Sequence, residues 1–124
     1  MSKRPVSKKP TLSLADRIGR VLTRVRREDH YMFFEERVEE SDAPDYYTII
    51  KQPMWIMMIE EKSKRGAYKS LDDIRSDLLL ICDNAVEYNP PDHPVTKEAQ
   101  RLRKVITRVV DSEKRLEARA KMRP

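Results

Sequence analysis

The 124-residue sequence has little cysteine, glycine and histidine, and each shortage argues against a class of function. The single Cys82 cannot close an internal disulfide, which favours a reducing compartment. Two glycines are too few for a glycine-rich phosphate-binding loop. The two histidines, His30 and His93, have neither metal-ligand spacing nor the neighbours of a catalytic nucleophile. We therefore expect no enzymatic activity, no metal and no cofactor.

Long apolar runs are also missing from the sequence. No run approaches the ~18 residues that a membrane-spanning helix requires. Residues 1–10 are basic and polar, unlike the apolar stretch of a secretory signal. The length fits one domain with short tails, and a helical bundle of this size can bury a core without disulfides or metals.

The net charge of +5 is unevenly distributed along the chain. Residues 1–10 carry four bases and no acid, and residues 97–124 carry ten bases and four acids. Residues 11–96 therefore hold twelve bases and seventeen acids. This acidic centre favours a cationic ligand, whereas the basic ends favour an anionic surface nearby.

Helical spacing of apolar residues predicts four helices. The first begins near Leu14 and fades near Asp29, and Ser13 can cap it. The second covers about residues 55–64 and stops before Gly66. The third follows a capping Ser70 and ends before residues 90–91, both proline. The fourth opens at residue 94 and continues to about residue 122.

Residues 30–53 lack the helical pattern and form a long predicted loop. Loops of this length in compact domains tend to be functional. The loop is rich in large apolar side chains, which a solvated linker would not carry. We expect it to pack on the helices and to form a pocket wall.

Two segments carry a resemblance to a known family. Residues 43–54 read APDYYTIIKQPM, and residues 82–91 read CDNAVEYNPP. Both resemble signatures of the bromodomain, and their order and separation match over roughly residues 12–115. The resemblance implies an all-α, left-handed four-helix bundle of helices Z, A, B and C, with a long ZA loop and a short BC loop. It also implies a binding module for acetylated lysine that has no catalytic activity.

The resemblance assigns roles to individual residues. Asn89 matches the anchor whose amide donates to the acetyl carbonyl, although an asparagine at a helix C-terminus is also common. Tyr46 matches the tyrosine that holds a water on the same carbonyl. For Tyr47 we expect core packing with a satisfied hydroxyl. The remaining pocket residues implied are Phe33, Phe34, Val38, Tyr88 and Val95, the last at the gatekeeper position, and core packing would look the same for each.

The sequence departs from the family where many members carry Trp-Pro-Phe. Met32, Phe33 and Phe34 occupy that stretch, so the tryptophan and proline are lost and the apolar shelf is altered. This divergence favours a remote lineage, such as a protist bromodomain factor. Residues 31–52 also hold six acids and two bases, which would attract the cationic neighbours of an acetylated lysine or simply keep the loop soluble.

Three functions compete at this point. The leading prediction is a nuclear chromatin reader of acetylated histone or other protein tails, acting as a monomeric domain of a larger protein or complex. The alternative is a helical nucleic-acid-binding domain that uses its basic ends, a tail at residues 1–11 and a charged helical extension at residues 116–124. Its binding would fall steeply with salt. The third is a structural bundle whose pocket has lost its function.

Overall fold

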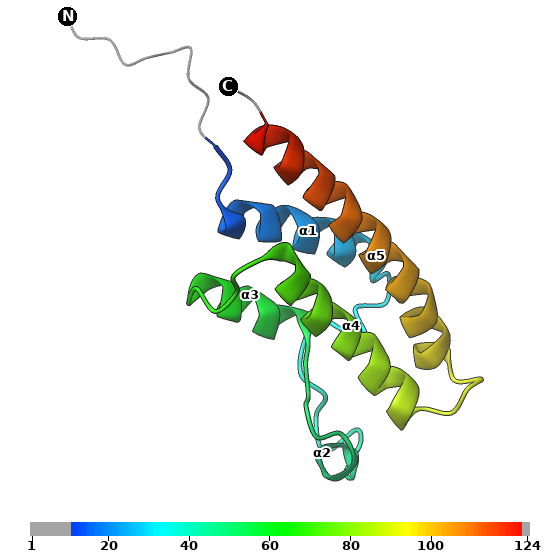
Figure 1. The fold of residues 1–124 in the computed structure, drawn as a ribbon. Helices are drawn as coiled ribbons and strands as arrows, with labels where there is room; N and C mark the ends of the chain where they lie inside the picture. Colours follow the sequence, from blue (N-terminus) through cyan, green and yellow to red (C-terminus); the bar gives the residue numbers. More distant parts are fainter. Residues whose placement is uncertain (1–10, 123–124) are drawn as a thin grey trace, which may run out of the picture.

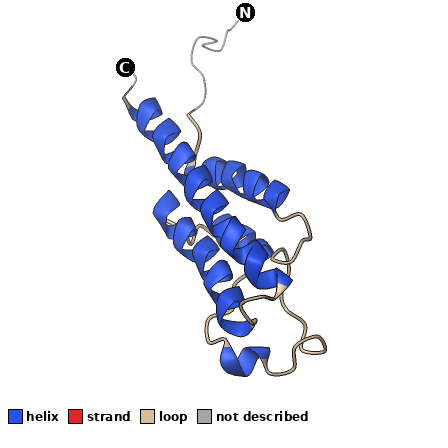
Figure 2. Ribbon diagram, turned by 90° about the vertical axis from the view of Figure 1, so that its right-hand side faces the viewer, coloured by secondary structure: helices blue, strands red, loops and turns tan. Residues whose placement is uncertain are grey.

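The computed structural model of the protein describes residues 11–122, and all of the regular secondary structure within them is helical (Figures 1 and 2). The elements are α1 (Leu14–Glu28), α2 (Tyr46–Ile49), α3 (Ile56–Lys64), α4 (Leu71–Tyr88) and α5 (Pro94–Lys121). The prediction of an all-α bundle is confirmed. Within the described residues, no helix is long and apolar enough to cross a membrane. The predicted basic tail lies, except for Thr11, outside the described residues.

Short-range hydrogen bonds set the helix ends at α1 and α3. The Ser13 hydroxyl accepts from the backbone N–H of Asp16, whose carboxylate accepts from the backbone N–H of Ser13, both at 3.0 Å. This reciprocal pair satisfies two backbone donors at the start of α1. Gly66 follows α3 with φ of +73°, a left-handed conformation that glycine adopts without strain. The predicted stop at Gly66 is therefore confirmed.

A histidine side chain sets the start of α5. His93 is the N-cap of α5, and its Nδ1 accepts from the backbone N–H of Val95 at 3.1 Å. Pro94 occupies the first helical position, where its missing N–H costs nothing. The neutral ring is the form that can accept this bond. The His93 side chain therefore caps the N-terminus of α5.

The core lies between α1, α3, α4 and α5, with the long loop covering one end (Figure 1). Each fully buried Val, Leu or Ile contributes roughly 1.5–3 kcal/mol of transfer free energy. The buried apolar residues of this core are Ile18, Val21, Leu22, Val25, Phe34, Ile56, Ile59, Tyr68, Leu71, Ile74, Leu78, Ile81, Cys82, Ala85, Ala99, Leu102, Val105, Ile106, Val109 and Val110. They come from α1, α3, α4 and α5, together with Phe34 of the long loop and Tyr68, which precedes α4.

The long loop is more structured than predicted. It contains α2, a four-residue helix that lies near the C-terminal end of α4 (Figure 1). One turn is too short to produce a hydrophobic period, so the sequence pattern could not reveal it. The expectation that the loop packs on the helices holds for Phe34, Tyr46 and Ile50, which are buried. It is wrong for Tyr31 and Met32, which are 66% and 67% exposed.

A buried ion pair joins α1 to α5. The Glu113 carboxylate is fully buried and accepts from Arg17 Nη1 at 2.8 Å and from Arg20 Nε at 3.0 Å. The Arg17 side chain is itself only 6% exposed, whereas that of Arg20 is 49% exposed. The two helices are therefore held together by charge as well as by apolar contact.

Candidate ligand-binding site

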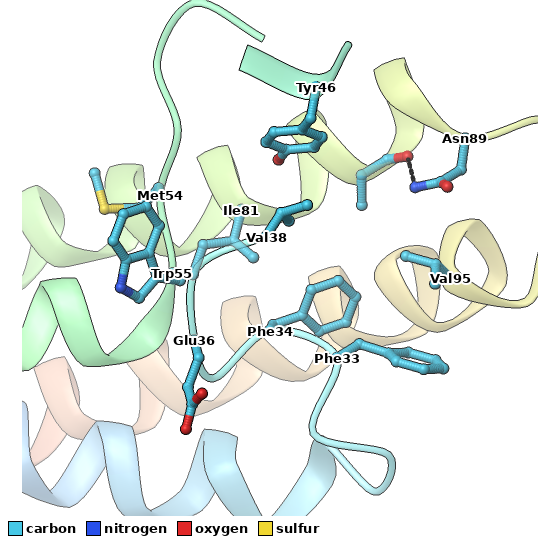
Figure 3. A pocket seen from close by; sticks show the side chains of 11 residues that line it. Phe33, Phe34, Glu36, Val38, Tyr46, Met54, Trp55, Ile81, Asn89 and Val95 are labelled. Carbon is cyan, nitrogen blue, oxygen red and sulfur yellow. Dashed lines mark hydrogen bonds between the residues drawn. The ribbon is translucent and has the colours of Figure 1, made fainter. Parts of the chain in front are cut away.

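A cavity of about 60 Å³ opens where the long loop meets the ends of three helices (Figure 3). Its walls come from the loop, from α2, from the start of α3, from the C-terminal half of α4 and from the start of α5. The lining residues are Phe33, Phe34, Glu36, Val38, Tyr46, Met54, Trp55, Ile81, Ala85, Asn89 and Val95. Most of these side chains are apolar, so a polar ligand group meets only a few partners.

Asn89 presents an oriented amide to this cavity. It is the C-cap of α4, and its Nδ2 donates to the backbone carbonyl of Ala85 at 3.0 Å (Figure 3). A carbonyl can only accept, so this bond fixes which end of the amide carries the NH2 group. The amide nitrogen has two protons, and the bond to Ala85 uses one. The other proton remains for a ligand acceptor.

Tyr46 places a phenol opposite this amide. The residue is 7% exposed, and its ring packs edge-on against Tyr47 and Tyr88, with centroid separations of 5.0 and 4.9 Å. Figure 3 shows its hydroxyl directed into the cavity. Burial, with smaller contributions from Tyr47 and Glu87, raises the pKa of Tyr46 to about 12. The hydroxyl therefore stays protonated at neutral pH and can donate.

Hydrogen bonds hold the start of the loop wall in place. The buried Asp29 carboxylate accepts from the backbone N–H groups of Phe33 at 3.1 Å and Phe34 at 3.0 Å. The Phe34 carbonyl in turn accepts from the N–H of Ile56, the first residue of α3, at 2.9 Å. Burial raises the pKa of Asp29, while the two backbone donors lower it. The phenylalanine wall is thus fixed before any ligand arrives.

Two further contacts fix the loop along its length. Arg26 of α1 donates to both carboxylate oxygens of Glu35, with Nη2–Oε2 at 2.9 Å and Nε–Oε1 at 3.0 Å. The paired guanidinium–carboxylate contact between Arg26 and Glu35 also fixes the orientation of the two groups. Near the other end of the loop, Nδ2 of the buried Asn84 donates to the Gln52 carbonyl at 2.8 Å. The cavity therefore has a preorganised wall.

The structure brings six of the seven expected pocket residues together around the cavity. They are Phe33, Phe34, Val38, Tyr46, Asn89 and Val95. Tyr88 is the exception, because it lies outside the cavity lining. It precedes Asn89 on α4 and so points about 100° away around the helix. Its hydroxyl donates to Asp45 Oδ1 at 2.7 Å, which ties α2 to α4 and supports Tyr46.

Tyr47 also lies outside the lining, as expected. Its hydroxyl donates to the Val38 carbonyl at 2.6 Å, and the Arg37 guanidinium lies 5.5 Å from its ring centroid. The expectation of a packed ring with a satisfied hydroxyl is confirmed. This contact sets the backbone position of Val38, one of the lining residues.

Sequence reasoning missed five lining residues: Glu36, Met54, Trp55, Ile81 and Ala85. Ile81 and Ala85 also belong to the buried core. Ile81, Ala85 and Asn89 follow one another at intervals of four residues, which puts all three on one helix face, and this signal was available in the sequence. Trp55, the N-cap of α3, supplies an aromatic wall from another element.

The altered shelf takes a distinct form. Met32 adopts φ of +56°, which is uncommon for a residue with a side chain. The reversal exposes Met32 and lets the ring of Tyr31 stack on Phe33, with centroids 5.2 Å apart and planes at 25°. The edge of the cavity is therefore a stacked aromatic pair.

Stability should fall at alkaline pH because buried acidic groups have raised pKa values. Burial raises the pKa of the Cys82 thiol from 9.0 to about 12, and that of Tyr46 from 10.0 to about 12. Burial and a bond to Asp77 also raise the pKa of Tyr68. The unfolded chain therefore releases these protons first. The unfolding free energy is expected to hold below pH 9 and to fall between about pH 9 and 12, by up to about 1.4 kcal/mol per pH unit for each group.

Urea unfolding at a series of pH values measures this effect. Cys82→Ala serves as the comparison, because it removes the thiol and should reduce the slope between pH 9 and 12. A stability that stays constant up to pH 12 would contradict the assignment.

Fold and site together define a small helical module with a mostly apolar cavity between a long loop and helix ends. Comparison with known proteins gives the family. The bromodomain family model matches residues 18–101, and the chain belongs to the bromodomain family. This is a family of acetyl-lysine reader modules.

Curated relatives agree with this assignment. The chain is 34% identical over 89 residues to bromodomain-containing protein 7 of Gallus gallus, covering 72% of this chain and 14% of the relative. It is 38% identical over 81 residues to bromodomain-containing protein 9 of Xenopus tropicalis, covering 65% of this chain and 14% of the relative. The chain thus spans about one seventh of the length of these relatives.

Solved structures show the same fold. The bromodomain of human BAZ1A superposes with a TM-score of 0.77 at 26% identity, covering 84% of this chain and 97% of that one. The Trypanosoma cruzi bromodomain BDF2 gives a TM-score of 0.76 at 23% identity, covering 84% and 91%. At that identity the second match speaks to the fold alone, so a protist origin stays a prediction.

Proposed function

We propose that this chain binds acetylated lysine on histone or other protein tails and serves as a chromatin reader in the nucleus. One observation carries the proposal: the Asn89 amide and the Tyr46 hydroxyl face the same small, mostly apolar cavity (Figure 3). We also propose that the domain is monomeric and belongs to a larger protein or complex.

An acetylated lysine side chain suits this cavity in size and chemistry. At roughly 10–15 Å³ per water position, the cavity of about 60 Å³ holds about four to six water-sized groups. An acetamide has four non-hydrogen atoms. Its carbonyl would accept the second Asn89 N–H directly and the Tyr46 hydroxyl through a water. Its methyl group would meet apolar wall residues such as Phe34 and Val38.

An unmodified lysine suits the same cavity poorly. Its ammonium group would lose hydration among apolar walls, at a cost that only an acceptor or a carboxylate could offset. The carboxylate of Glu36, an exposed residue, is directed away from Asn89 and Tyr46 (Figure 3). The part of the cavity near Asn89 and Tyr46 therefore favours a neutral amide over a cation.

The acidic loop would select the surroundings of the acetylated lysine. Glu35 is neutralised by Arg26, and Asp45 accepts from Tyr88. The other acids of residues 31–52 are exposed: Glu36, Glu39, Glu40 and Asp42. Their field would attract lysine and arginine residues that flank the acetylated site in a histone tail.

A matched pair of peptides tests the proposal. By isothermal titration calorimetry, an acetylated histone-tail peptide is expected to bind with Kd on the order of 10–1000 μM. The same peptide with unmodified lysine should bind at least about ten-fold more weakly, because its ammonium group is desolvated without a partner. Equal affinity for the two peptides would overturn the reader assignment.

A further inference from the structure

The long α5 helix carries a row of basic residues on its outward side. Lys97, Lys104, Arg108, Arg115 and Arg119 are exposed and follow one another at intervals of seven, four, seven and four residues. These intervals keep all five on one face of a helix with 3.6 residues per turn. None of the five forms an ion pair with another residue between 11 and 122.

The neighbouring α1 helix extends this basic row. It packs beside α5, where Arg24 Nη1 donates to Ser112 Oγ at 3.4 Å (Figure 1). Arg20 and Arg27 follow the same face of α1, at spacings of four and three residues from Arg24, and both are exposed. Together with the α5 row, these three arginines form what we term the basic face.

Three carboxylates beside the basic face are already paired. Glu28 pairs with Arg101 at 3.2 Å, and Asp111 pairs with Arg75 at 2.6 Å. Glu113 is buried beneath the face and pairs with Arg17 and with Arg20, which is itself a member of the face. The positive charge of the basic face is therefore largely uncompensated by the folded chain, and it attracts an anionic partner.

We propose that the basic face docks on the phosphate backbone of duplex DNA. The 22-residue separation of Lys97 and Arg119 corresponds to about 33 Å along the helix axis at 1.5 Å per residue. That length matches one turn of duplex, about 34 Å, so the row can reach across a groove to phosphates of both strands. Most members are arginines, whose forked donors suit phosphate oxygens.

This surface is separate from the acetyl-lysine site and does not rest on the proposed function. None of its residues lines the cavity. It also relocates the DNA contact that the sequence predicted at the chain ends. Most of the basic charge of residues 97–124 lies on the folded helix α5, and the arginines of α1 add to it. Residues 1–10 lie outside the described structure.

Two charge-matched variants test the proposal in the full chain. The face variant combines Lys104→Gln, Arg108→Gln and Arg115→Gln. The control combines Lys64→Gln, Arg65→Gln and Lys69→Gln, three exposed positions at the end of α3 and in the turn before α4. Each variant loses three positive charges, so net charge alone cannot separate them, and circular dichroism checks that both stay helical.

Fluorescence anisotropy with a 20-base-pair duplex between 25 and 200 mM salt provides the measurement. Each lost phosphate contact lowers the slope of log affinity against log salt by about 0.9. The face variant should therefore lose about 2.7 in slope and at least ten-fold in affinity at 50 mM salt. The control should bind within about two-fold of the wild type, because it leaves the face intact.

Three outcomes would overturn the proposal. The first is equal loss in both variants, which would mean that only net charge matters. The second is absence of duplex binding by the wild type at 25 mM salt. The third is binding to phosphatidylserine vesicles, abolished in the face variant, without binding to duplex, which would make the partner a lipid surface.

Discussion

Glu113→Ala is expected to lower the free energy of unfolding by about 3–5 kcal/mol, the largest stability loss expected of any single substitution considered for this chain. The carboxylate is fully buried and is the partner of the Arg17 guanidinium, whose side chain is 6% exposed. Removing Glu113 leaves that charge buried and unpaired. Arg20 is half exposed and can turn to water, so its contribution to the loss is small. Urea denaturation followed by circular dichroism measures the change.

Two comparisons give this test its specificity. Glu117→Ala, four residues further along the surface of α5, should change stability by no more than about 0.5 kcal/mol. The double variant Arg17→Met, Glu113→Met replaces both charges with apolar groups of similar size and should recover most of the loss. A Glu113→Ala variant within 1 kcal/mol of the wild type would show that Arg17 finds water or another partner.

The buried ion pair also shows where sequence reasoning stops. The fourth helix was predicted to run from residue 94 to about residue 122, and α5 confirms it by running from Pro94 to Lys121. No role was predicted for Glu113. Glu113 follows Ile106 and Val110 at core spacing, so its inward position was readable from the sequence. Its partner on α1 was not, because pairing across 96 residues depends on tertiary packing.

The long helices could be predicted because several signals agree. Apolar spacing, the caps Ser13 and Ser70 and the stop at Gly66 all point to the same boundaries. These signals are local and survive without tertiary information. The conformation of the loop could not be predicted in this way, because it depends on contacts between residues distant in sequence, such as Asn84 with the Gln52 carbonyl. A local sequence pattern does not indicate such long-range partners.

The candidate site was predictable only where a motif named its residues. Asn89 and Tyr46 came from the family resemblance, and they face one cavity in the structure. Trp55 was read as the start of a helix, and nothing in its neighbours marked it as a cavity wall. It reaches the cavity because the Phe34 carbonyl accepts from the N–H of Ile56 and so brings the loop against α3. The sequence alone therefore indicates that the apolar shelf is altered, but it does not indicate that Trp55 lines the cavity.

Asn89→Ala is expected to weaken acetyl-lysine binding by roughly five- to 150-fold, which corresponds to about 1–3 kcal/mol for a lost hydrogen bond in a mostly dry cavity. The variant removes the amide that we propose donates to the ligand carbonyl. It also removes the bond from Nδ2 to Ala85, at the last turn of α4. Because that bond lies at a helix end outside the core, the unfolding free energy should fall by about 1 kcal/mol or less.

Two further variants rank the contributions within the same calorimetric experiment. Tyr46→Phe keeps the ring that packs between Tyr47 and Tyr88 but removes the hydroxyl, so a water can remain with one partner fewer. Its loss should be smaller than that of Asn89→Ala. Glu87→Ala, an exposed position on the same helix, should bind within about two-fold of the wild type. If Asn89→Ala stays folded by circular dichroism and binds as tightly as the wild type, the ligand is anchored elsewhere, and the amide serves only to cap α4.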